Sequence, residues 1–229
     1  MAAMPTAFIT GANRGIGLEF VKQLAARGDR VYAACRTPAK ADELSKLDGD
    51  IEIVACDVVD PKSVKAAAKA VEGSIDLLVN NAGVSGPKYE VPSDTPFDVE
   101  TVTGVYRANV IGPMLVTQAL AGKMANPSKA ATISSGYGSI AQADENWPAF
   151  YCSSKAAANM TAKILGKQLA PRGVTYISLS PGWVKTDMGG QNATQTPEES
   201  ISKMLALFDK LTPEDAGKFY DRGGDELPY

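Results

Sequence analysis

Tyr151 and Lys155, four residues apart, are the pair in this sequence with the clearest chemical potential. Residues at this spacing lie on one face of a helix, so the phenol and the ammonium would be neighbours. A nearby cation favours phenolate and lowers the pKa of a tyrosine from about 10, which makes the pair a usable acid–base couple. The alternative is an exposed helical pair without a chemical role.

The amino-acid composition narrows the chemistry further. The chain contains no histidine, which excludes Ser–His and Cys–His nucleophiles and leaves no basis for a His-ligated metal site. Acid–base work at neutral pH therefore falls to tyrosine, lysine, cysteine or carboxylate side chains. Just upstream of Tyr151, a strand-like segment ends in two hydroxyls, Ser134 and Ser135. Open α/β sheets place their sites at such carboxyl ends of strands.

A glycine-rich turn follows the first predicted strand. Its spacing is G-x-x-x-G-x-G, and its residues are Gly11, Ala12, Asn13, Arg14, Gly15, Ile16 and Gly17. Glycines at this position let backbone N–H groups approach a pyrophosphate at the positive end of the following helix. A tight turn that binds nothing is the alternative. A P-loop is a poor competitor because no G-K-[ST] follows the glycines.

The elements that must position these residues alternate along the chain. Strands are predicted at Thr6–Thr10, Arg30–Cys35, Ile51–Ala55, Ile75–Asn80, Ala130–Ser134, Val174–Ser180 and Lys218–Tyr220. Helices are predicted at Gly15–Arg27, Ala39–Leu47, Pro61–Val71, Phe97–Met124, Tyr151–Ala170 and Pro197–Lys210, with a Gly/Pro-rich loop before the fourth. Strict alternation predicts an α/β fold, a doubly wound parallel sheet with helices on both faces. No linker divides residues 1–229, so one domain is expected.

The composition limits the possible binding partners of the protein and its cellular compartment. Of 229 residues, 45% are hydrophobic and 21% charged, which allows a large core, and the net charge of −3 argues against nucleic-acid binding. No apolar run reaches the roughly 18 residues that span a membrane. The first residues do not resemble a signal peptide, so a cytoplasmic protein is expected. Three cysteines make a poor disulfide framework, and Cys35 and Cys56 are expected to be small core residues on strands.

Six ordered motifs match one known family along the whole chain. They are Thr10-Gly11-x-x-x-Gly15-x-Gly17, Asn80-Asn81-Ala82-Gly83, Asn109, Ile133-Ser134-Ser135, Tyr151-x-x-x-Lys155 and Pro181-Gly182. The chain resembles a classical short-chain dehydrogenase/reductase. Its segment from Pro181 to Gly190 and its compact C-terminal end resemble the sniffer-type carbonyl reductases and the C-factor proteins. The resemblance implies a Rossmann-like sheet of about seven strands in the order 3-2-1-4-5-6-7.

The resemblance also implies catalytic roles. Tyr151 would protonate the substrate oxygen, while Lys155 would lower the pKa of the tyrosine and hold the nicotinamide ribose. Ser135, rather than Ser134, would bind the substrate carbonyl, although a longer segment before Tyr151 puts the choice of serine in doubt. Asn109 would hold a water that links Lys155 to solvent, unless it is only a polar residue inside a helix.

The same resemblance implies a binding site for NADP(H). The residues that would bind it are Gly11, Asn13, Arg14, Gly15, Ile16, Gly17, Arg36, Asp57, Val58, Asn81, Ala82, Gly83, Tyr151, Lys155, Pro181, Gly182, Val184 and Thr186. Asp57 would contact the adenine, with helix capping as its alternative. Cys35 occupies the position at which NAD-dependent relatives place a carboxylate for the ribose. The neutral Cys35, with Arg36 and Arg14 as a phosphate clamp, favours NADPH.

Function and assembly are then expected as follows. The protein would use NADPH to reduce a small aldehyde, ketone or quinone to the alcohol. The alternative is a cofactor-binding regulatory protein of the C-factor type with little turnover. Trp147 and Pro148 would line the substrate mouth, or form a surface loop that packs on itself.

Assembly is expected through the helices Phe97–Met124 and Tyr151–Ala170, which would pair in a homodimer or homotetramer. Ala156, Ala157 and Ala158 would allow close approach of the second helix pair, or merely pack this helix on its own sheet.

Overall fold

The computed structural model describes residues 4–87 and 96–229, and its elements follow the predicted alternation. The strands are β1 (Thr6–Thr10), β2 (Arg30–Cys35), β3 (Ile51–Ala55), β4 (Ile75–Asn80), β5 (Met124–Ile133), β6 (Val174–Ser180) and β7 (Phe219–Asp221). The helices are α1 (Gly15–Ala26), α2 (Asp42–Ser45), α3 (Pro61–Ala70), α4 (Val99–Tyr106), α5 (Gly112–Leu120), α6 (Ala149–Leu169) and α7 (Pro197–Lys210). The loop expected before Pro96 lies partly outside the described residues.

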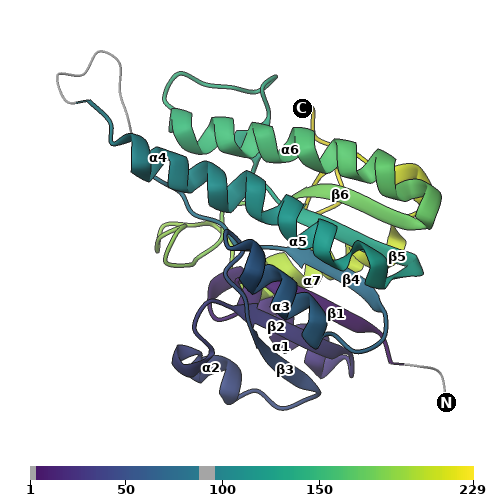
Figure 1. Ribbon diagram of the computed structural model, residues 1–229. Helices are drawn as coiled ribbons and strands as arrows, with labels where there is room; N and C mark the ends of the chain where they lie inside the picture. The colour runs from purple at the N-terminus through teal and green to yellow at the C-terminus, as the bar shows by residue number, and fades with distance from the viewer. Residues whose placement is uncertain (1–3, 88–95) are drawn as a thin grey trace.

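All seven strands form one parallel sheet in the order β3-β2-β1-β4-β5-β6-β7, which confirms the predicted topology. Because the strands are parallel, their carboxyl ends gather along one edge, on the left in Figure 1. The loop that follows β6 lies at this edge. The strand order changes direction between β1 and β4, which is the position at which doubly wound sheets bind their ligands.

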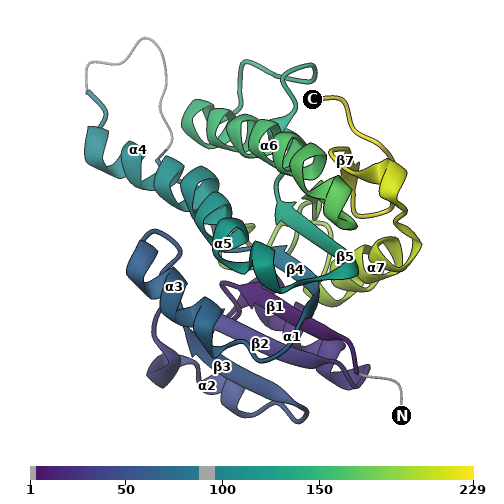
Figure 2. The same ribbon diagram turned by 45° about the vertical axis from the view of Figure 1, so that its right-hand side comes forward.

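Helices cover both faces of the sheet, and each face has its own core. On one face, Phe20 and Leu24 of α1 and Met204 and Phe208 of α7 pack on the sheet. The other core takes its helical side chains from α3, α5 and α6, namely Val64, Val116, Leu120 and Ala162. Figure 2 shows α5 and α6 side by side over this second face, and α5 continues the line of α4. These two cores hold the sheet rigid and so fix the positions of the strand ends that carry the site residues.

The predicted long helix Phe97–Met124 is interrupted. Asp98 caps α4 by accepting from the N–H groups of Glu100 and Thr101 at 3.3 and 3.1 Å. A π-helical segment, Arg107–Ile111, joins α4 to α5, and a 3₁₀ turn over Ala121–Lys123 ends the helical stretch. The helical stretch thus begins two residues later than expected, after the capping carboxylate of Asp98, and ends one residue earlier, since β5 begins at Met124.

Other boundaries differ more modestly. β5 is longer at its start than the predicted strand Ala130–Ser134, because Met124 already pairs with Ile75 through an irregular register. A 3₁₀ turn over Pro38–Lys40 and the four-residue α2 replace the predicted helix Ala39–Leu47. α6 starts two residues before Tyr151. Among the described residues, no helix is long and apolar enough to cross a bilayer.

Candidate active site

The glycine turn between β1 and α1 has the geometry of a backbone cradle. Gly11 and Gly15 adopt φ values of +64° and +54°, which side-chain-bearing residues rarely adopt. A Cβ at Gly17 would lie 2.2 Å from the Gly11 carbonyl oxygen. The first turn of α1 carries no acidic residue and no side-chain cap at Arg14, so no capping side chain competes with a ligand for its N–H groups. These features fit the pyrophosphate of a dinucleotide.

Asn81 and Thr10 brace this turn against the end of β4. The Thr10 hydroxyl accepts from the backbone N–H groups of Asn81 and Ala82 at 3.0 and 3.1 Å. The Asn81 amide donates to the carbonyls of Thr10 and Gly11 at 2.9 and 3.2 Å. The side chain of Asn81 therefore fixes the shape of the glycine turn. Thr10 belongs to the glycine motif of the sequence, but the motif alone does not identify it as a residue that shapes the site.

Tyr151 and Lys155 lie on one face of α6, as their spacing predicts. The Lys155 ammonium is 5.6 Å from the centre of the Tyr151 ring. Its Nζ donates to the Ile133 carbonyl at 2.8 Å, so the last residue of β5 holds the lysine at the carboxyl edge of the sheet. Lys155 is 6% exposed. The helix thus delivers both groups to the edge where the glycine turn lies.

The pKa shifts of this pair differ from the sequence-based expectation. Burial raises the pKa of Tyr151 to about 12, and the Ser135 hydroxyl acts weakly in the opposite direction. Burial also lowers the pKa of Lys155 to about 8. The expected lowering of the tyrosine pKa by Lys155 is not found, because desolvation is the main influence on the phenol and Lys155 is not among the groups that shift its pKa. Tyr151 is consequently protonated at neutral pH and suited to donate a proton.

Ser135 is the better placed of the two serines. It is half-buried at the end of β5, and its hydroxyl accepts from the N–H of Tyr137 at 3.2 Å. It also interacts with the phenol of Tyr151. Ser134 is 2% exposed, and its hydroxyl has no hydrogen-bond partner among the described residues. Ser135 can reach a ligand beside Tyr151, whereas Ser134 is enclosed in the sheet.

Asn109 lies in the π-helical segment and faces Lys155 across Gly83. A Cβ at Gly83 would lie 2.9 Å from Asn109 Oδ1 and 3.6 Å from Lys155 Nζ. The Asn109 amide binds both backbone groups of Val84 at 2.9 Å and donates to the Ser154 hydroxyl at 3.0 Å. Asn109 therefore anchors the chain after β4 beside the lysine. Its proposed water relay remains a prediction.

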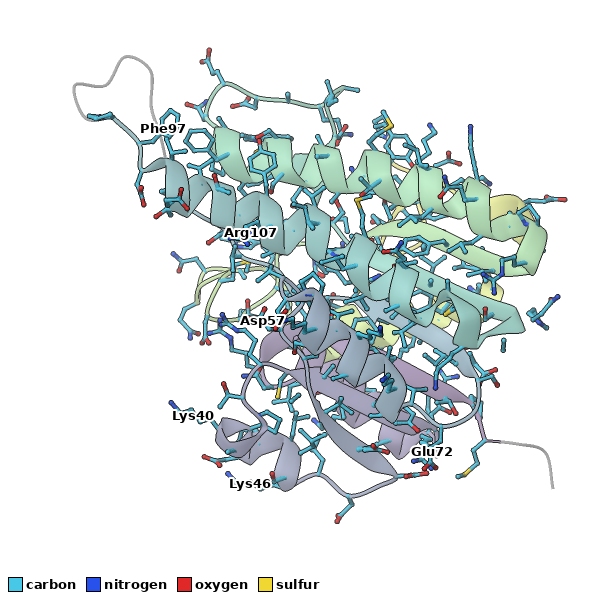
Figure 3. The ribbon with its side chains drawn as sticks, viewed as in Figure 1. Lys40, Lys46, Asp57, Glu72, Phe97 and Arg107 are labelled. Carbon is cyan, nitrogen blue, oxygen red and sulfur yellow. The ribbon has the colours of Figure 1, made fainter. Side chains whose placement is uncertain are left out.

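Two further predicted residues lie where β3 ends. Figure 3 shows Asp57 at the carboxyl edge of the sheet. Its Oδ1 accepts from the Val59 N–H at 3.2 Å, while Asp60 caps α3. The capping alternative for Asp57 is therefore wrong, and its carboxylate shapes the turn before α3. Val58 is buried, where a Cβ on Gly112 would come within 2.9 Å of it.

The residues expected to read the adenosine phosphate occupy the end of β2. Cys35 is 2% exposed, and burial raises the pKa of its thiol, so this position carries no charge. Arg36 follows it and is exposed. Arg14, also exposed, forms an ion pair with Asp187 at 3.1 Å. The sequence offered no signal for this partner, because Asp187 is 173 residues away.

The segment after β6 is folded back on itself. Gln195 pairs with Val184, and Lys185 N–H donates to the Gln195 carbonyl at 2.8 Å. The Thr186 hydroxyl accepts from the Gly189 N–H at 3.1 Å, and a Cβ at Gly15 would lie 3.3 Å from the Thr186 methyl. Thr186 thus lies against the glycine turn. Pro181 and Gly182, which has a φ of +77°, start this segment at the end of β6.

Sequence reasoning missed two groups beside the catalytic candidates. Tyr137 follows Ser135, and its ring centre is 6.4 Å from that of Tyr151. Asn159 of α6 donates to the Gly138 carbonyl at 3.1 Å and so holds the turn that carries Tyr137. A tyrosine two residues after the serine is the one signal that could have drawn attention to this region. No cluster of three or more metal-ligating side chains occurs in residues 4–87 and 96–229.

Comparison with known proteins agrees with this geometry. Residues 5–197 match the family described as short chain dehydrogenase. An uncharacterized oxidoreductase of Schizosaccharomyces pombe is 37% identical, with 97% of each chain covered. C-signal of Myxococcus xanthus is 35% identical over 71% of this chain and 98% of its own length. The chain belongs to the short-chain dehydrogenase family, as its motifs predicted.

Among solved structures of this family, carbonyl reductases are similar to this chain. An NADPH-bound carbonyl reductase from chicken fatty liver superposes with a TM-score of 0.90 at 34% identity, covering 99% of both chains. The carbonyl reductase Sniffer of Drosophila melanogaster gives 0.90 at 25% identity, covering 99% of this chain and all of that one. The predicted resemblance to sniffer-type carbonyl reductases and C-factor-like proteins is confirmed.

Proposed function

We propose that this protein uses NADPH to reduce a small aldehyde, ketone or quinone to the alcohol. The observation that carries the proposal is the convergence of Ser135, Tyr151 and Lys155 at the carboxyl edge of the sheet, beside the glycine cradle. The similarity to an NADPH-bound carbonyl reductase supports it. NADPH would supply the hydride, and the protein would supply orientation and the proton.

In this mechanism Ser135 and Tyr151 bind the carbonyl oxygen of the substrate from one side. Tyr151 donates its proton as the oxygen gains charge, and its raised pKa keeps it protonated in the resting protein. Lys155, with a pKa of about 8, is a stronger acid than the phenol, so returning a proton to the tyrosine is downhill. The pair is therefore arranged for reduction. Asn109 would bind the water molecule that links Lys155 to solvent.

The remaining predicted residues would bind the nucleotide. The pyrophosphate would lie against the backbone of the glycine turn and Ile16, with Asn13 at the edge. Ala82 and Gly83 would border the ribose that Lys155 holds. Asp57 and Val58 would contact the adenine. Pro181, Gly182, Val184 and Thr186 would bind the carboxamide of the nicotinamide. The fit rests on the absence of Cβ atoms in the cradle, where a side chain would collide with the chain itself.

A preference for NADPH over NADH follows from the end of β2. A buried neutral thiol at Cys35 neither binds two ribose hydroxyls as a carboxylate does nor repels a 2′-phosphate. Arg36 follows Cys35 and Arg14 lies in the glycine turn; both are exposed, and guanidinium groups bind phosphates with forked hydrogen bonds. In the chain alone Arg14 is paired with Asp187, so phosphate binding would compete with that bridge.

The test of this function is NADPH consumption, followed by its absorbance, against a panel of aldehydes, ketones and quinones. Turnover that requires Tyr151 is the expected result. Binding of NADPH without turnover on any carbonyl would contradict the proposal. It would favour the second candidate, a regulatory nucleotide-binding protein, which the similarity to C-signal supports. The presence of Ser135, Tyr151 and Lys155 together favours the enzyme.

We also infer that two copies pair through α4, α5 and α6, which lie side by side in Figures 1 and 2. These helices present exposed apolar side chains, at Val99, Ile111, Met114, Met160 and Ile164. Ala158 is fully buried against its own chain, so of the three alanines only Ala156 and Ala157 remain partly accessible. A monomer mass by light scattering at micromolar concentration would contradict the pairing.

A further inference from the structure

Tyr137 stands directly beside the reacting groups of the proposed reductase. It lies in a 3₁₀ turn, Gly136–Gly138, that begins immediately after Ser135 and is capped by the Ser135 hydroxyl. Its ring meets the ring of Tyr151 edge to face, with centres 6.4 Å apart and planes at 79°. The Tyr137 ring is therefore a neighbour of any group that reaches the Tyr151 phenol.

A second aromatic ring backs Tyr137. The Trp147 ring lies 4.5 Å from that of Tyr137, centre to centre, with an angle of 33° between the planes. Trp147 is half-buried, whereas Tyr137 remains 42% exposed. Trp147 thus supports one side of Tyr137, while much of the tyrosine ring is left to solvent or to a ligand. We call Tyr137 and Trp147 the aromatic wall.

Hydrogen bonds from two other elements hold the aromatic wall in place. Asn159 of α6 donates to the Gly138 carbonyl at 3.1 Å. The backbone carbonyl of Tyr229 accepts from the Ala141 N–H at 3.1 Å. The Tyr229 ring is itself fixed, 4.1 Å below the Lys163 ammonium and 5.8 Å from the Phe219 ring. A surface ordered before the ligand arrives loses little entropy on binding.

We propose that the aromatic wall makes the site selective for flat, aromatic carbonyl compounds, with Tyr137 as the specificity-determining residue. The inference rests on the proposed reductase function. An aryl ring attached to the reacting carbonyl lies against Tyr137 while the oxygen reaches Ser135 and Tyr151. Aromatic pairs contribute beyond their buried area, by amounts that correspond to roughly 2- to 12-fold in affinity. A saturated ring of the same size buries similar area without this contribution.

The test compares benzaldehyde with cyclohexanecarbaldehyde, which share a six-membered ring and a formyl group. We expect the parent protein to have a KM about 3- to 10-fold lower for benzaldehyde, whatever the difference in kcat that their unequal carbonyl reactivity causes. Tyr137→Leu should abolish this preference and Tyr137→Phe should retain it, with unchanged melting temperatures since Tyr137 is exposed. An unaltered preference in Tyr137→Leu, or none in the parent, overturns the proposal.

A binding measurement separates this inference from the function on which it rests. Benzamide and cyclohexanecarboxamide are not reduced, and each is titrated while the tryptophan fluorescence is recorded. Benzamide should bind more tightly and change the emission of the parent, and Trp147→Phe should remove most of that change. If no carbonyl is reduced but benzamide still binds selectively through Tyr137, the reductase function fails and the aromatic site stands. Equal binding of the two amides overturns the aromatic site.

Discussion

At the carboxyl edge of the sheet, the regions that follow β1 and β5, on either side of β4, are built differently. The glycine cradle at β1 is made of backbone, closed by Thr10 and Asn81 and so tight that a Cβ at Gly17 would meet a carbonyl at 2.2 Å. The region after β5 is made of side chains, namely Ser135, Tyr137 and Tyr151. The cradle can bind only what fits a fixed backbone shape. In the proposed function the side-chain region would define the reaction and its selectivity, and we expect it to tolerate change without loss of the fold.

The largest expected effect lies in the side-chain region. Tyr151→Phe removes the proton donor while it keeps the ring, so kcat for carbonyl reduction should fall by about 10²–10⁴-fold. NADPH binding and the melting temperature should stay near those of the parent. Steady-state kinetics and nucleotide titration measure both. Tyr106→Phe, which removes a hydroxyl bonded to Ser153 at 2.7 Å, is the control and should keep kcat.

A substitution in the glycine cradle should instead lower stability and NADPH binding, the two properties that Tyr151→Phe leaves unchanged. In Gly17→Ala the new methyl meets the Gly11 oxygen and, at 2.6 Å, the Asn81 amide, both of which are held in place. We expect the free energy of unfolding to fall by about 1–3 kcal/mol and NADPH affinity to fall more than tenfold. Gly122→Ala, at a position with open space, is the matched control. An alanine variant with parental nucleotide affinity would refute the tight cradle.

The same contrast explains what the sequence could predict. The alternation of strands and helices, the glycine turn and the Tyr151–Lys155 pair follow from local patterns, since spacing places them at strand ends and on helix faces. The strand order, in contrast, was implied only by the family resemblance. The raised pKa of Tyr151 could not be predicted, because it depends on how deeply tertiary packing buries the phenol. Nor could the break in the helix near Asn109, whose amide bonds to Val84 across 25 residues.

The third prediction concerns cofactor choice, at the end of β2. Arg36→Ala removes one half of the proposed phosphate clamp and should lower kcat/KM for NADPH about tenfold or more, with little change for NADH. Adding Cys35→Asp should move the preference further towards NADH, although it places a carboxylate at a buried position. Arg172→Ala, at the opposite edge of the sheet, serves as the control. Equal kcat/KM for both nucleotides in the parent would contradict the clamp.

The pH profile tests the lysine. Lys155 has its pKa lowered to about 8 by burial, so its charge is present below pH 8 and is lost above it. Because kcat/KM for NADPH reports the free enzyme, it should be level from pH 6 to 7 and about tenfold lower by pH 9. Tyr151, with a pKa of about 12, stays protonated throughout this range. A profile that is flat to pH 10 would show that the lysine charge does not assist nucleotide binding.

The smallest expected effect lies where the cradle and the segment after β6 meet, at the bridge between Arg14 and Asp187. The two side chains are 68% and 79% exposed, and such pairs contribute about 0–1 kcal/mol. Asp187→Asn frees Arg14 for a 2′-phosphate, so the Kd for NADPH should fall by up to about fivefold while the Kd for NADH is unchanged. Since screening shortens electrostatic reach to about 3 Å at 1 M salt, the gain should vanish there. Equal tightening for both nucleotides would instead assign Asp187 to repulsion of the shared pyrophosphate. Weaker binding of both would show that the bridge closes the loop over the nucleotide rather than competing with it.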